Sequence, residues 1–349
     1  MKNTLTAVAM SGGVDSSVAA SLLAAEGEAL VGFSMKLVAD AHGRCCSPED
    51  FQDARRVADR LGFPHYVLDM EEDFRRHVRD PFQEDYAQGR TPSPCLRCNT
   101  LLKFGALLAR ARAVGAERVA TGHYARLTKD PRRGRTLLHR AADLTKDQSY
   151  YLFDLSEAQR AAALFPLGHL RKEEVRAAAR EAGLATAEKP ESMDLCFVPP
   201  GASYRDAMRA SAPGEFVDEK GAVVGHHGGI ERFTVGQRRG LGLAASTPLY
   251  VLKIEPESRR IVVGEEHALL SETCTLGRTR WIPFERPVGP LRATVRIRST
   301  HPGAEATLID HGDGTATVRF QTPQRAIAPG QALVAYDGDL VLGGGWIAS

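Results

Sequence analysis

The sequence predicts an α/β doubly wound parallel sheet, followed by a small central domain and a C-terminal β-barrel. From residue 5 to about residue 184, short apolar runs alternate with stretches of helical periodicity, which is typical of a parallel sheet whose strands are joined by helices. After about residue 199, glycine and proline become frequent, the segments shorten and the helical periodicity fades. The two parts of the chain are therefore expected to differ in architecture.

Strands and helices alternate through the first part. We expect strands at residues 5–10, 29–37, 65–70 and 118–123. We expect helices near residues 16–25, 48–61, 99–114 and 171–182. Ser47 precedes Pro48, and Asp50 follows close behind, which is typical of a helix start because serine and carboxylate can accept each other's backbone N–H groups. In a sheet of this kind, ligands bind beyond the carboxyl ends of the strands.

Short strand candidates dominate the rest of the chain. Residues 214–229 are rich in turn formers, and residues 249–263 predict a hairpin. Further strands are expected at residues 291–298, 304–309, 316–321 and 332–336. Asp313-Gly314 is a hairpin turn signal. We therefore expect three domains, at residues 1–205, 206–272 and 273–349.

Composition is that of an ordinary globular protein. The chain has 349 residues, 43% of them hydrophobic and 25% charged, with a net charge of +2 that indicates no particular partner. No apolar run approaches the roughly 18 residues of a membrane span, and no apolar signal region opens the chain, so we expect a cytoplasmic protein with no membrane partner. Six cysteines do not form a disulfide scaffold in a chain of this length, and catalytic, metal-binding or buried thiols fit them better.

A glycine- and serine-rich loop ends the first predicted strand. The run from Ser11 to Ser17, SGGVDSS, opens a helix. Glycines let the backbone turn sharply and approach an anion, while serine hydroxyls and the N–H groups of the helix start supply donors. It is not a Walker loop, because no lysine followed by serine or threonine is present. Asp15 could orient this loop or help to hold magnesium. The alternative is a tight turn without a ligand.

Three cysteines suggest sulfur or metal chemistry. Cys95 and Cys98 lie in the segment TPSPCLRCN, directly before a predicted helix. A thiol beside Arg97 at a helix start should ionise readily to the nucleophilic thiolate. With the distant Cys196, they allow a persulfide relay, an iron–sulfur cluster with an open iron, or a structural zinc site, which normally needs four ligands. Cys274 is expected to be buried.

Two groups of arginine and lysine could contact RNA. Six cations fall between residues 126 and 140, where either phosphate contact or a solvated hairpin would explain them. They are Arg126, Lys129, Arg132, Arg133, Arg135 and Arg140. Arg292, Arg296 and Arg298 alternate along one predicted strand and should share a face of the barrel.

These motifs together resemble the bacterial tRNA-specific 2-thiouridylases, the MnmA family within the PP-loop ATP pyrophosphatases. The resemblance runs over essentially the whole chain. It is carried by residues 9–17, 89–104, 121–126, 145–152, 192–197, 234–242 and 342–347. Among these, TKDQSYYL at 145–152 and TVGQRRGLG at 234–242 are the most specific in combination.

The resemblance implies an enzyme that places sulfur at C2 of the wobble uridine, position 34, in the anticodon region of tRNA. ATP with magnesium would adenylate O2 of that base, releasing pyrophosphate and then AMP. Cys98 would be the nucleophile and Cys196 would carry a persulfide, supplied by a donor such as a cysteine desulfurase or a sulfur relay protein. Residues 1–205 would form the catalytic domain, and residues 273–349 the tRNA-binding barrel.

Ligand contacts also follow from the resemblance. ATP would be held by Ala9, Met10, Ser11, Gly12, Gly13, Val14, Asp15, Ser16, Met35 and Gly122. The target base would meet Ser93, Pro94 and Cys95. Other tRNA contacts would come from His123, Lys146, Asp147, Gln148, Arg298, Ser299 and Gln331.

Cys95 departs from the pattern of many family members, which carry aspartate there. The replacement removes a carboxylate and adds a thiol, and CxxC also occurs in the family. It raises the prospect of a four-iron four-sulfur cluster on Cys95, Cys98 and Cys196. Persulfide relay and cluster chemistry stand as two hypotheses of similar weight.

Two rival functions would explain part of the sequence. An amide synthetase of the ATP pyrophosphatase class, acting on a small metabolite, would account for the loop but not for the cysteines or the basic barrel. It would release pyrophosphate with ammonia and without RNA. A non-catalytic RNA-binding module stabilised by metal would bind tRNA without consuming ATP.

Overall fold

The computed structural model describes residues 4–38, 47–190, 195–198, 201, 203–208 and 211–348. The chain divides into two compact units, which are described separately. The first unit comprises Met1–Val78, Cys95–Tyr204 and Asp339–Val341. The second comprises Arg79–Pro94, Arg205–Gly338 and Leu342–Ser349. No helix in the described part of the chain is long and apolar enough to cross a membrane.

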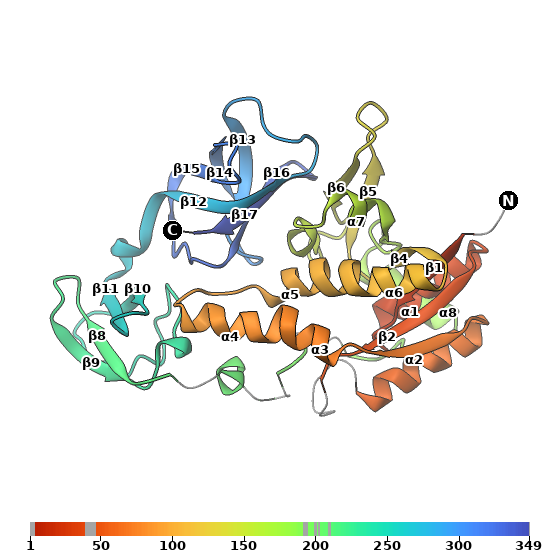
Figure 1. Cartoon of the computed structure of the whole chain (residues 1–349), viewed down its shortest axis with the longest axis horizontal. Coiled ribbons are helices and arrows are strands. Elements are labelled where there is room, and N and C mark those ends of the chain that lie inside the picture. Colours follow the sequence, from red (N-terminus) through yellow and green to blue (C-terminus); the bar gives the residue numbers. More distant parts are fainter. Residues whose placement is uncertain are drawn as a thin grey trace. The chain divides into compact units, whose positions relative to one another are not determined.

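The first unit is built on a five-stranded parallel sheet (Figure 1). Its strands are β1 (Leu5–Ala9), β2 (Leu30–Lys36), β3 (His65–Asp69), β4 (Ala116–Ala120) and β7 (Ala163–Leu164), in the order β3-β2-β1-β4-β7. The central strand β1 buries Ala7 and Val8 completely, because a parallel sheet is covered on both faces. The chain adds β2 and β3 on one side of β1 and then β4 on the other. The predicted doubly wound fold is confirmed, and its switch point lies after β1 and β4.

Three helices pack together beside this sheet. They are α1 (Val14–Ala25), α2 (Pro48–Leu61) and α8 (Lys172–Glu181). Their apolar faces meet in one buried cluster that includes Val18, Val57 and Val175. The predicted start of α2 is confirmed, since Asp50 donates its N–H to Ser47 Oγ and its carboxylate accepts the Ser47 N–H, both at 3.1 Å.

The CxxC segment lies inside a helix rather than before it. The elements α5 (Pro94–Arg97), the π-helical η2 (Cys98–Leu107) and α6 (Leu108–Ala113) follow one another directly. The sequence predicted a later start, but Pro94 has the fixed φ that suits a first helical position. The side-chain amide of Gln159 donates to the carbonyls of Thr100 at 2.7 Å and Phe104 at 2.9 Å, which supports the π-helical turns.

Further elements belong to the first unit or to the segments that connect it with the second unit. They are α3 (Glu71–Phe74), the π-helical η1 (Arg75–Arg79), α4 (Asp80–Ala87), β5 (Ala125–Lys129), β6 (Thr136–Arg140), the 3-10 turns η3 (Ser149–Leu152) and η4 (Tyr204–Ala207), and α7 (Glu157–Ala162). The helical stretch over residues 71–87 was missed from the sequence. Its signal was present, because Phe74, Val78, Phe82 and Tyr86 recur at every fourth position and all are buried.

The second unit contains a closed six-stranded antiparallel barrel. Its strands are β12 (Leu270–Trp281), β13 (Leu291–Arg296), β14 (Ala304–Asp310), β15 (Ala316–Arg325), β16 (Ala332–Asp337) and β17 (Leu340–Ile347). They run in the order β12-β15-β14-β13-β16-β17, and pairing of β12 with β17 closes the barrel. Val295, Leu308 and Val318 are fully buried inside it. The predicted turn at Asp313 is confirmed, since its carboxylate accepts the N–H of Thr315 at 2.9 Å.

A smaller four-stranded sheet precedes the barrel in the same unit. It consists of β8 (Gly214–Val217), β9 (Val223–His227), β10 (Tyr250–Glu255) and β11 (Arg260–Gly264), with the 3-10 turns η5 (Ile230–Arg232) and η6 (Glu266–Leu269). The strands run in the order β10-β11-β8-β9. The predicted hairpin over residues 249–263 is confirmed by the antiparallel pairing of β10 with β11. Phe216, Val251 and Ile261 form its fully buried core.

Candidate active site

The glycine-serine loop lies at the switch point of the sheet, between β1 and α1. Gly12 has a φ of +70°, and a Cβ built on it would lie 2.3 Å from the carbonyl oxygen of Asp50. Only glycine therefore fits at this position without moving α2. The helix α1 begins after Gly13, which has no side chain to cap it. Its first-turn N–H groups and its dipole favour an anion here.

Serine hydroxyls fix the shape of this loop. Ser16 Oγ donates to the carbonyl of Gly13 at 3.1 Å and accepts the N–H of Ser11 at 3.2 Å. Ser17 Oγ donates to the same carbonyl at 2.9 Å. The side chains of Met10 and Val14 are buried, so these two predicted ATP contacts would have to act through their backbone atoms. The loop is thus held in shape by its own hydroxyl groups.

The segment that follows β4 forms another side of the candidate nucleotide site. A Cβ on Gly122 would lie 2.7 Å from both the Asp15 carbonyl carbon and the Ser16 nitrogen, so the two backbones touch at the start of α1. The structure therefore brings Gly122 together with the loop, as the resemblance implied. Met35 is half-buried near the end of β2, the strand that pairs with β1. The predicted nucleotide contacts therefore come from three adjacent strands.

Gly12→Ala is expected to weaken ATP binding about tenfold or more, because the added methyl group collides with Asp50 and the positive φ strains alanine. Gly27→Ala is the matched control. Gly27 has a similar φ of +78°, but nothing lies within 4 Å of its Cβ. Calorimetric titration with ATP measures both variants. Equal losses of affinity would show that backbone strain, and not the close approach at the loop, causes the effect.

Asp15 joins the loop to two residues from elsewhere in the unit. Its Oδ1 accepts the Tyr124 hydroxyl at 2.7 Å and the Lys172 ammonium at 2.6 Å. The same ammonium lies 5.6 Å from the centre of the Tyr124 ring. Lys172 is only 11% exposed and was not identified from the sequence, where nothing near it marks a site. An ammonium beside a first-turn carboxylate adds positive charge to a site suited to phosphate.

Hydrogen bonds connect this loop to the helix that carries the cysteines. The Gln148 side chain accepts the Tyr124 N–H at 2.9 Å, and the Gln148 N–H donates to the Tyr124 carbonyl at 2.9 Å. Tyr151 donates its N–H to the Gln148 carbonyl at 3.0 Å, and Asn99 Nδ2 donates to the Tyr151 carbonyl at 2.9 Å. Asn99 is the neighbour of Cys98. Gln148, predicted as a tRNA contact, therefore ties together the two halves of the candidate site.

The other predicted contacts of this unit lie in the same region. Asp147 accepts the N–H groups of Ala141 at 3.2 Å and Ser149 at 3.1 Å, so it shapes the turn before η3, and Lys146 beside it is half-buried. His123 is buried, and burial together with the neighbouring Lys103 ammonium lowers its pKa well below the usual value. A neutral His123 could meet RNA through hydrogen bonding or stacking, but not through charge.

The three cysteines have different exposures. Cys95 is exposed on α5, Cys98 is buried at the start of η2, and Cys196 is half-buried. The ring of Phe197 packs edge-on against Phe74 of α3 with centroids 5.5 Å apart, which fixes the chain next to Cys196. Residues 191–194, which belong to the segment singled out around Cys196, lie outside the described residues.

The three thiols are not grouped as the ligands of a single metal ion. Among the residues that the structure describes, no three histidine, cysteine, aspartate or glutamate side chains are grouped as metal ligands would be. Cys95, Cys98 and Cys196 are all within that part of the chain.

The predicted target-base segment belongs to the second unit up to Pro94. Ser93 and Pro94 are buried there. Gln331 Nε2 donates to the carbonyls of Thr91 at 2.9 Å and Pro92 at 3.3 Å. Gln331 thus holds this proline-rich segment in place against the barrel.

Arg292 and Arg296 share one face of β13, as expected, but the strand ends at Arg296 and not at the predicted residue 298, so Arg298 lies beyond it. Along β13, Ala293 and Val295 are buried, while Arg292 and Arg296 point to the other face. The Arg296 guanidinium donates to the carbonyls of Ser299 and His301, so it builds the turn after the strand. Arg298 and Ser299 in that turn are half-buried.

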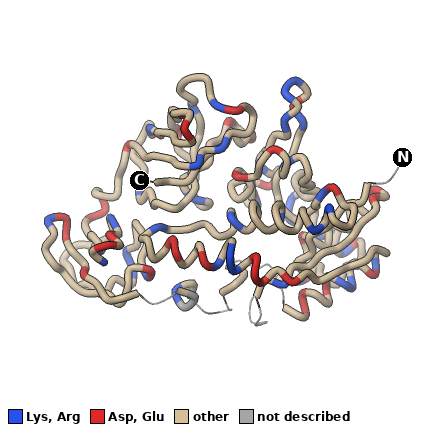
Figure 2. The backbone as a smooth tube through the Cα atoms, in the orientation of Figure 1, with Lys and Arg blue, Asp and Glu red and all other residues tan. Residues whose placement is uncertain are grey.

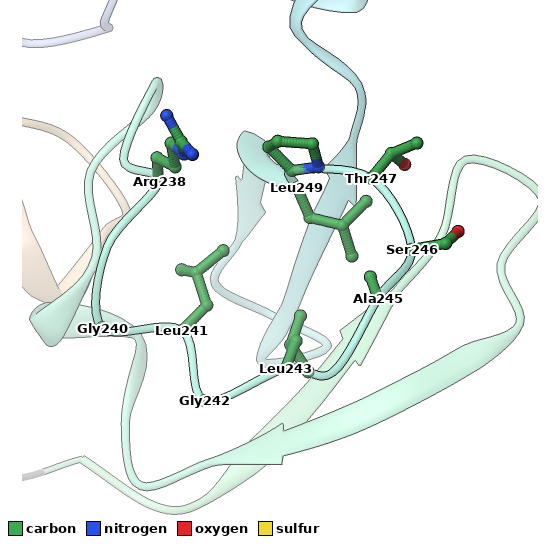
Figure 3. A pocket seen from close by; sticks show the side chains of 10 residues that line it. Arg238, Gly240, Leu241, Gly242, Leu243, Ala245, Ser246, Thr247 and Leu249 are labelled. Carbon is green, nitrogen blue, oxygen red and sulfur yellow. The ribbon is translucent and has the colours of Figure 1, made fainter.

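The conspicuous segment at residues 234–242 lines a cavity of about 390 Å³ in the second unit (Figure 3). Its walls are Arg238, Gly240, Leu241, Gly242, Leu243, Ala245, Ser246, Thr247, Pro248 and Leu249. The polar side-chain groups of these residues are one guanidinium and two hydroxyls, and the rest of the lining is leucine, glycine, alanine and proline. The lining therefore includes no thiol, carboxylate or imidazole. The cavity is therefore not a candidate catalytic site.

The fold and the loop define a nucleotide-binding α/β domain with a glycine-serine anion loop at the switch point of its sheet, joined to a β-barrel unit. Residues 4–200 match the family model described as the tRNA methyl transferase HUP domain. Residues 205–265 match its PRC-barrel domain, and residues 271–347 match the aminomethyltransferase beta-barrel domain.

Relatives cover nearly the whole chain. It is 48% identical to the tRNA-specific 2-thiouridylase MnmA of Koribacter versatilis over 367 residues, 99% of each chain. It is 47% identical to the proteins of that name from Acidobacterium capsulatum, over 99% of each chain, and Solibacter usitatus, over 98% of each. The chain belongs to the tRNA-specific 2-thiouridylase family, which confirms the resemblance seen in the sequence.

Proposed function

We propose that the protein is a tRNA-uridine 2-sulfurtransferase, which converts the wobble uridine at position 34 of tRNA to 2-thiouridine. The observation that carries this proposal is the 47–48% identity to tRNA-specific 2-thiouridylases over 98–99% of the chain. The anion loop at the switch point of the sheet supports it, because the chemistry needs ATP. We propose that residues 1–205 are catalytic, residues 206–272 a linking domain and residues 273–349 a tRNA-binding barrel.

ATP activates the oxygen that must leave. A uridine carbonyl oxygen is a poor leaving group, so the O2 atom attacks the α-phosphorus of ATP, pyrophosphate departs and the N3 proton is released. The loop from Ser11 to Ser16 binds the phosphates through its N–H groups and hydroxyls. Magnesium, which Asp15 could hold, would offset the negative charge on the phosphates. A base within tRNA must leave its stack to reach this site.

Sulfur then replaces the adenylated oxygen. The terminal sulfur of a persulfide on Cys196 attacks C2, and AMP leaves with the former O2. The Cys98 thiolate attacks the Cys196 sulfur, which breaks the remaining S–S bond and releases the anion of 2-thiouridine, which takes up a proton from water at N3. A Cys98–Cys196 disulfide is left, and a thiol reductant returns both to thiols with two electrons. The relay requires only that the sulfur atoms of Cys98 and Cys196 come into contact once in each turnover.

We propose the relay because it uses Cys98 and Cys196 in the roles that the family resemblance implies, and the iron–sulfur cluster is the alternative. Cys95→Asp separates the two. The substitution supplies the residue that many family members carry and removes one cluster ligand, so a relay enzyme should keep its thiolation rate within about threefold. The measurement is 2-thiouridine formation by mass spectrometry, with iron analysis after anaerobic purification. Iron bound to the unchanged chain, together with loss of thiolation in the Cys95→Asp variant, would establish the cluster instead.

Partners follow from the same proposal. The substrate is the anticodon region of tRNA, met by Ser93, Pro94 and Cys95 at the target base. The sulfur comes from a cysteine desulfurase or a sulfur relay protein. Because both substrate and donor belong to the cytoplasm of a bacterium, we place the protein there.

Reconstitution tests the whole function. The chain is incubated with tRNA bearing uridine 34, ATP, cysteine and a cysteine desulfurase, and 2-thiouridine, AMP and pyrophosphate are measured. All three should appear together. Pyrophosphate release that requires ammonia and no RNA would instead indicate an amide synthetase. Binding of tRNA without any consumption of ATP would indicate a non-catalytic RNA-binding module.

A further inference from the structure

The hairpin formed by β5 and β6 carries exposed cations at its end. Lys129, Arg132 and Arg133 are exposed there, and Arg135 beside them is half-buried. Figure 2 shows lysine and arginine at the tip of this hairpin, which Figure 1 shows extending away from the parallel sheet. The catalytic proposal gives these side chains no role.

The base of the hairpin is anchored, and the cations there are structural. Leu138 is completely buried, and Arg160 Nε donates to the Thr136 carbonyl at 2.8 Å. Arg126 donates to the Asp339 carboxylate at 2.8 Å and to the Arg140 carbonyl at 2.7 Å. The sequence grouped all of these arginines into one cationic cluster. The structure separates the anchored base from the exposed tip.

Hydrogen bonds fix the turn at the tip. The Asp130 carboxylate accepts the backbone N–H of Arg132 at 2.9 Å and of Arg133 at 3.3 Å. Gly134 donates its N–H to the Asp130 carbonyl at 2.8 Å and has a φ of +65°. The one acidic residue of the turn is therefore engaged with the backbone. An ordered turn holds its cations in place at low entropic cost for binding.

We propose that this tip binds the phosphate backbone of the tRNA on the duplex that flanks the target nucleotide. The inference rests on the proposed function. β5 begins at Ala125, directly after Tyr124, whose hydroxyl contacts Asp15 in the nucleotide loop. Five residues per strand span about 17 Å, so the tip can reach RNA that lies well beyond the nucleotide loop. Duplex RNA is bound through its backbone and shape, which suits a group of exposed cations on an ordered turn.

The triple variant Lys129→Ala, Arg132→Ala, Arg133→Ala tests the proposal. Its dissociation constant for full-length tRNA should rise about tenfold at roughly 0.1 M salt, because up to three phosphate contacts are lost. The slope of log K against log salt should fall by up to about 3. Its affinity for ATP and its thiolation rate at saturating tRNA should stay unchanged.

A control variant removes the same charge elsewhere in the unit. Arg55, Arg56 and Arg180 are exposed on α2 and α8, and all three are changed to alanine. Equal weakening in the two variants, or unchanged tRNA binding in the hairpin variant, would overturn the inference. Normal tRNA binding with slower sulfur uptake would overturn it in favour of a docking role for the donor protein. Failure of the wild-type chain to thiolate tRNA would count against the proposed function. The comparison of tRNA affinities would still test whether the hairpin tip binds tRNA.

Discussion

Cys98→Ser is expected to abolish 2-thiouridine formation while leaving ATP binding intact. A serine hydroxyl cannot attack the Cys196 sulfur at neutral pH, so the S–S bond that joins the product to Cys196 is not broken and 2-thiouridine is not released. The loss should be at least about a thousandfold, which is typical when a nucleophile is removed. Affinity for ATP should hold, because the loop is shaped by its own serines and by Gly122 rather than by the thiol.

Cys274→Ser is the matched control, because Cys274 is also a buried thiol. It lies in the barrel strand β12, and burial raises its pKa to about 12, so it stays protonated and unreactive at neutral pH. This variant should thiolate tRNA normally. Mass spectrometry of the tRNA nucleosides measures both variants, and 2-thiouridine accumulating with Cys98→Ser would refute the role assigned to that thiol.

Asp15→Ala is expected to suppress AMP formation about a hundredfold or more. The carboxylate orients the Lys172 ammonium and the Tyr124 hydroxyl at the phosphate loop, at 2.6 and 2.7 Å, and it is the candidate magnesium ligand. Misplaced charge at a phosphoryl-transfer site lowers the rate by this factor because catalysis there depends on the positions of the charged groups and on their electrostatic stabilisation of the transition state. Release of AMP from radiolabelled ATP in the presence of tRNA measures the effect.

Two further variants show how Asp15 acts. Asp53→Ala removes a carboxylate from another ion pair of the same unit, 2.7 Å from Lys189, and should leave AMP formation unchanged. Lys172→Met should reduce AMP formation as much as Asp15→Ala does if the carboxylate acts only through the ammonium. It should reduce AMP formation less if the carboxylate also binds magnesium. Normal AMP release from Asp15→Ala would remove the loop from the mechanism.

Local signals predicted much of the first unit. The capping pair Ser47 and Asp50 gave the start of α2, because both partners lie within one helical turn. The strand β4 was expected at residues 118–123 but runs from Ala116 to Ala120. Thr121 and Tyr124 are buried in the loop that follows, so burial prolonged the apolar run beyond the strand. Apolar periodicity reports burial and cannot by itself mark where strand pairing stops.

The long-range part of the candidate site could not be predicted. Lys172 contacts Asp15 across 157 positions, and Gln331 holds Thr91 across 240. Neither pair leaves a local pattern, because nothing in a helix start or a strand end specifies its distant partner. Gln331 was expected at the RNA by resemblance alone, and its hydrogen bonds to Thr91 and Pro92 are known only from the structure.

The most direct measurement follows AMP and 2-thiouridine in a single turnover, using tRNA that carries either uridine or 2-thiouridine at the target position. The proposed chemistry predicts that uridine gives AMP and new 2-thiouridine in a one-to-one ratio. It predicts no AMP from tRNA that already carries 2-thiouridine, because that base has no O2 to adenylate. AMP released at the same rate with the thiolated tRNA, or without any RNA, would show that the nucleotide loop does not act on the base that receives sulfur.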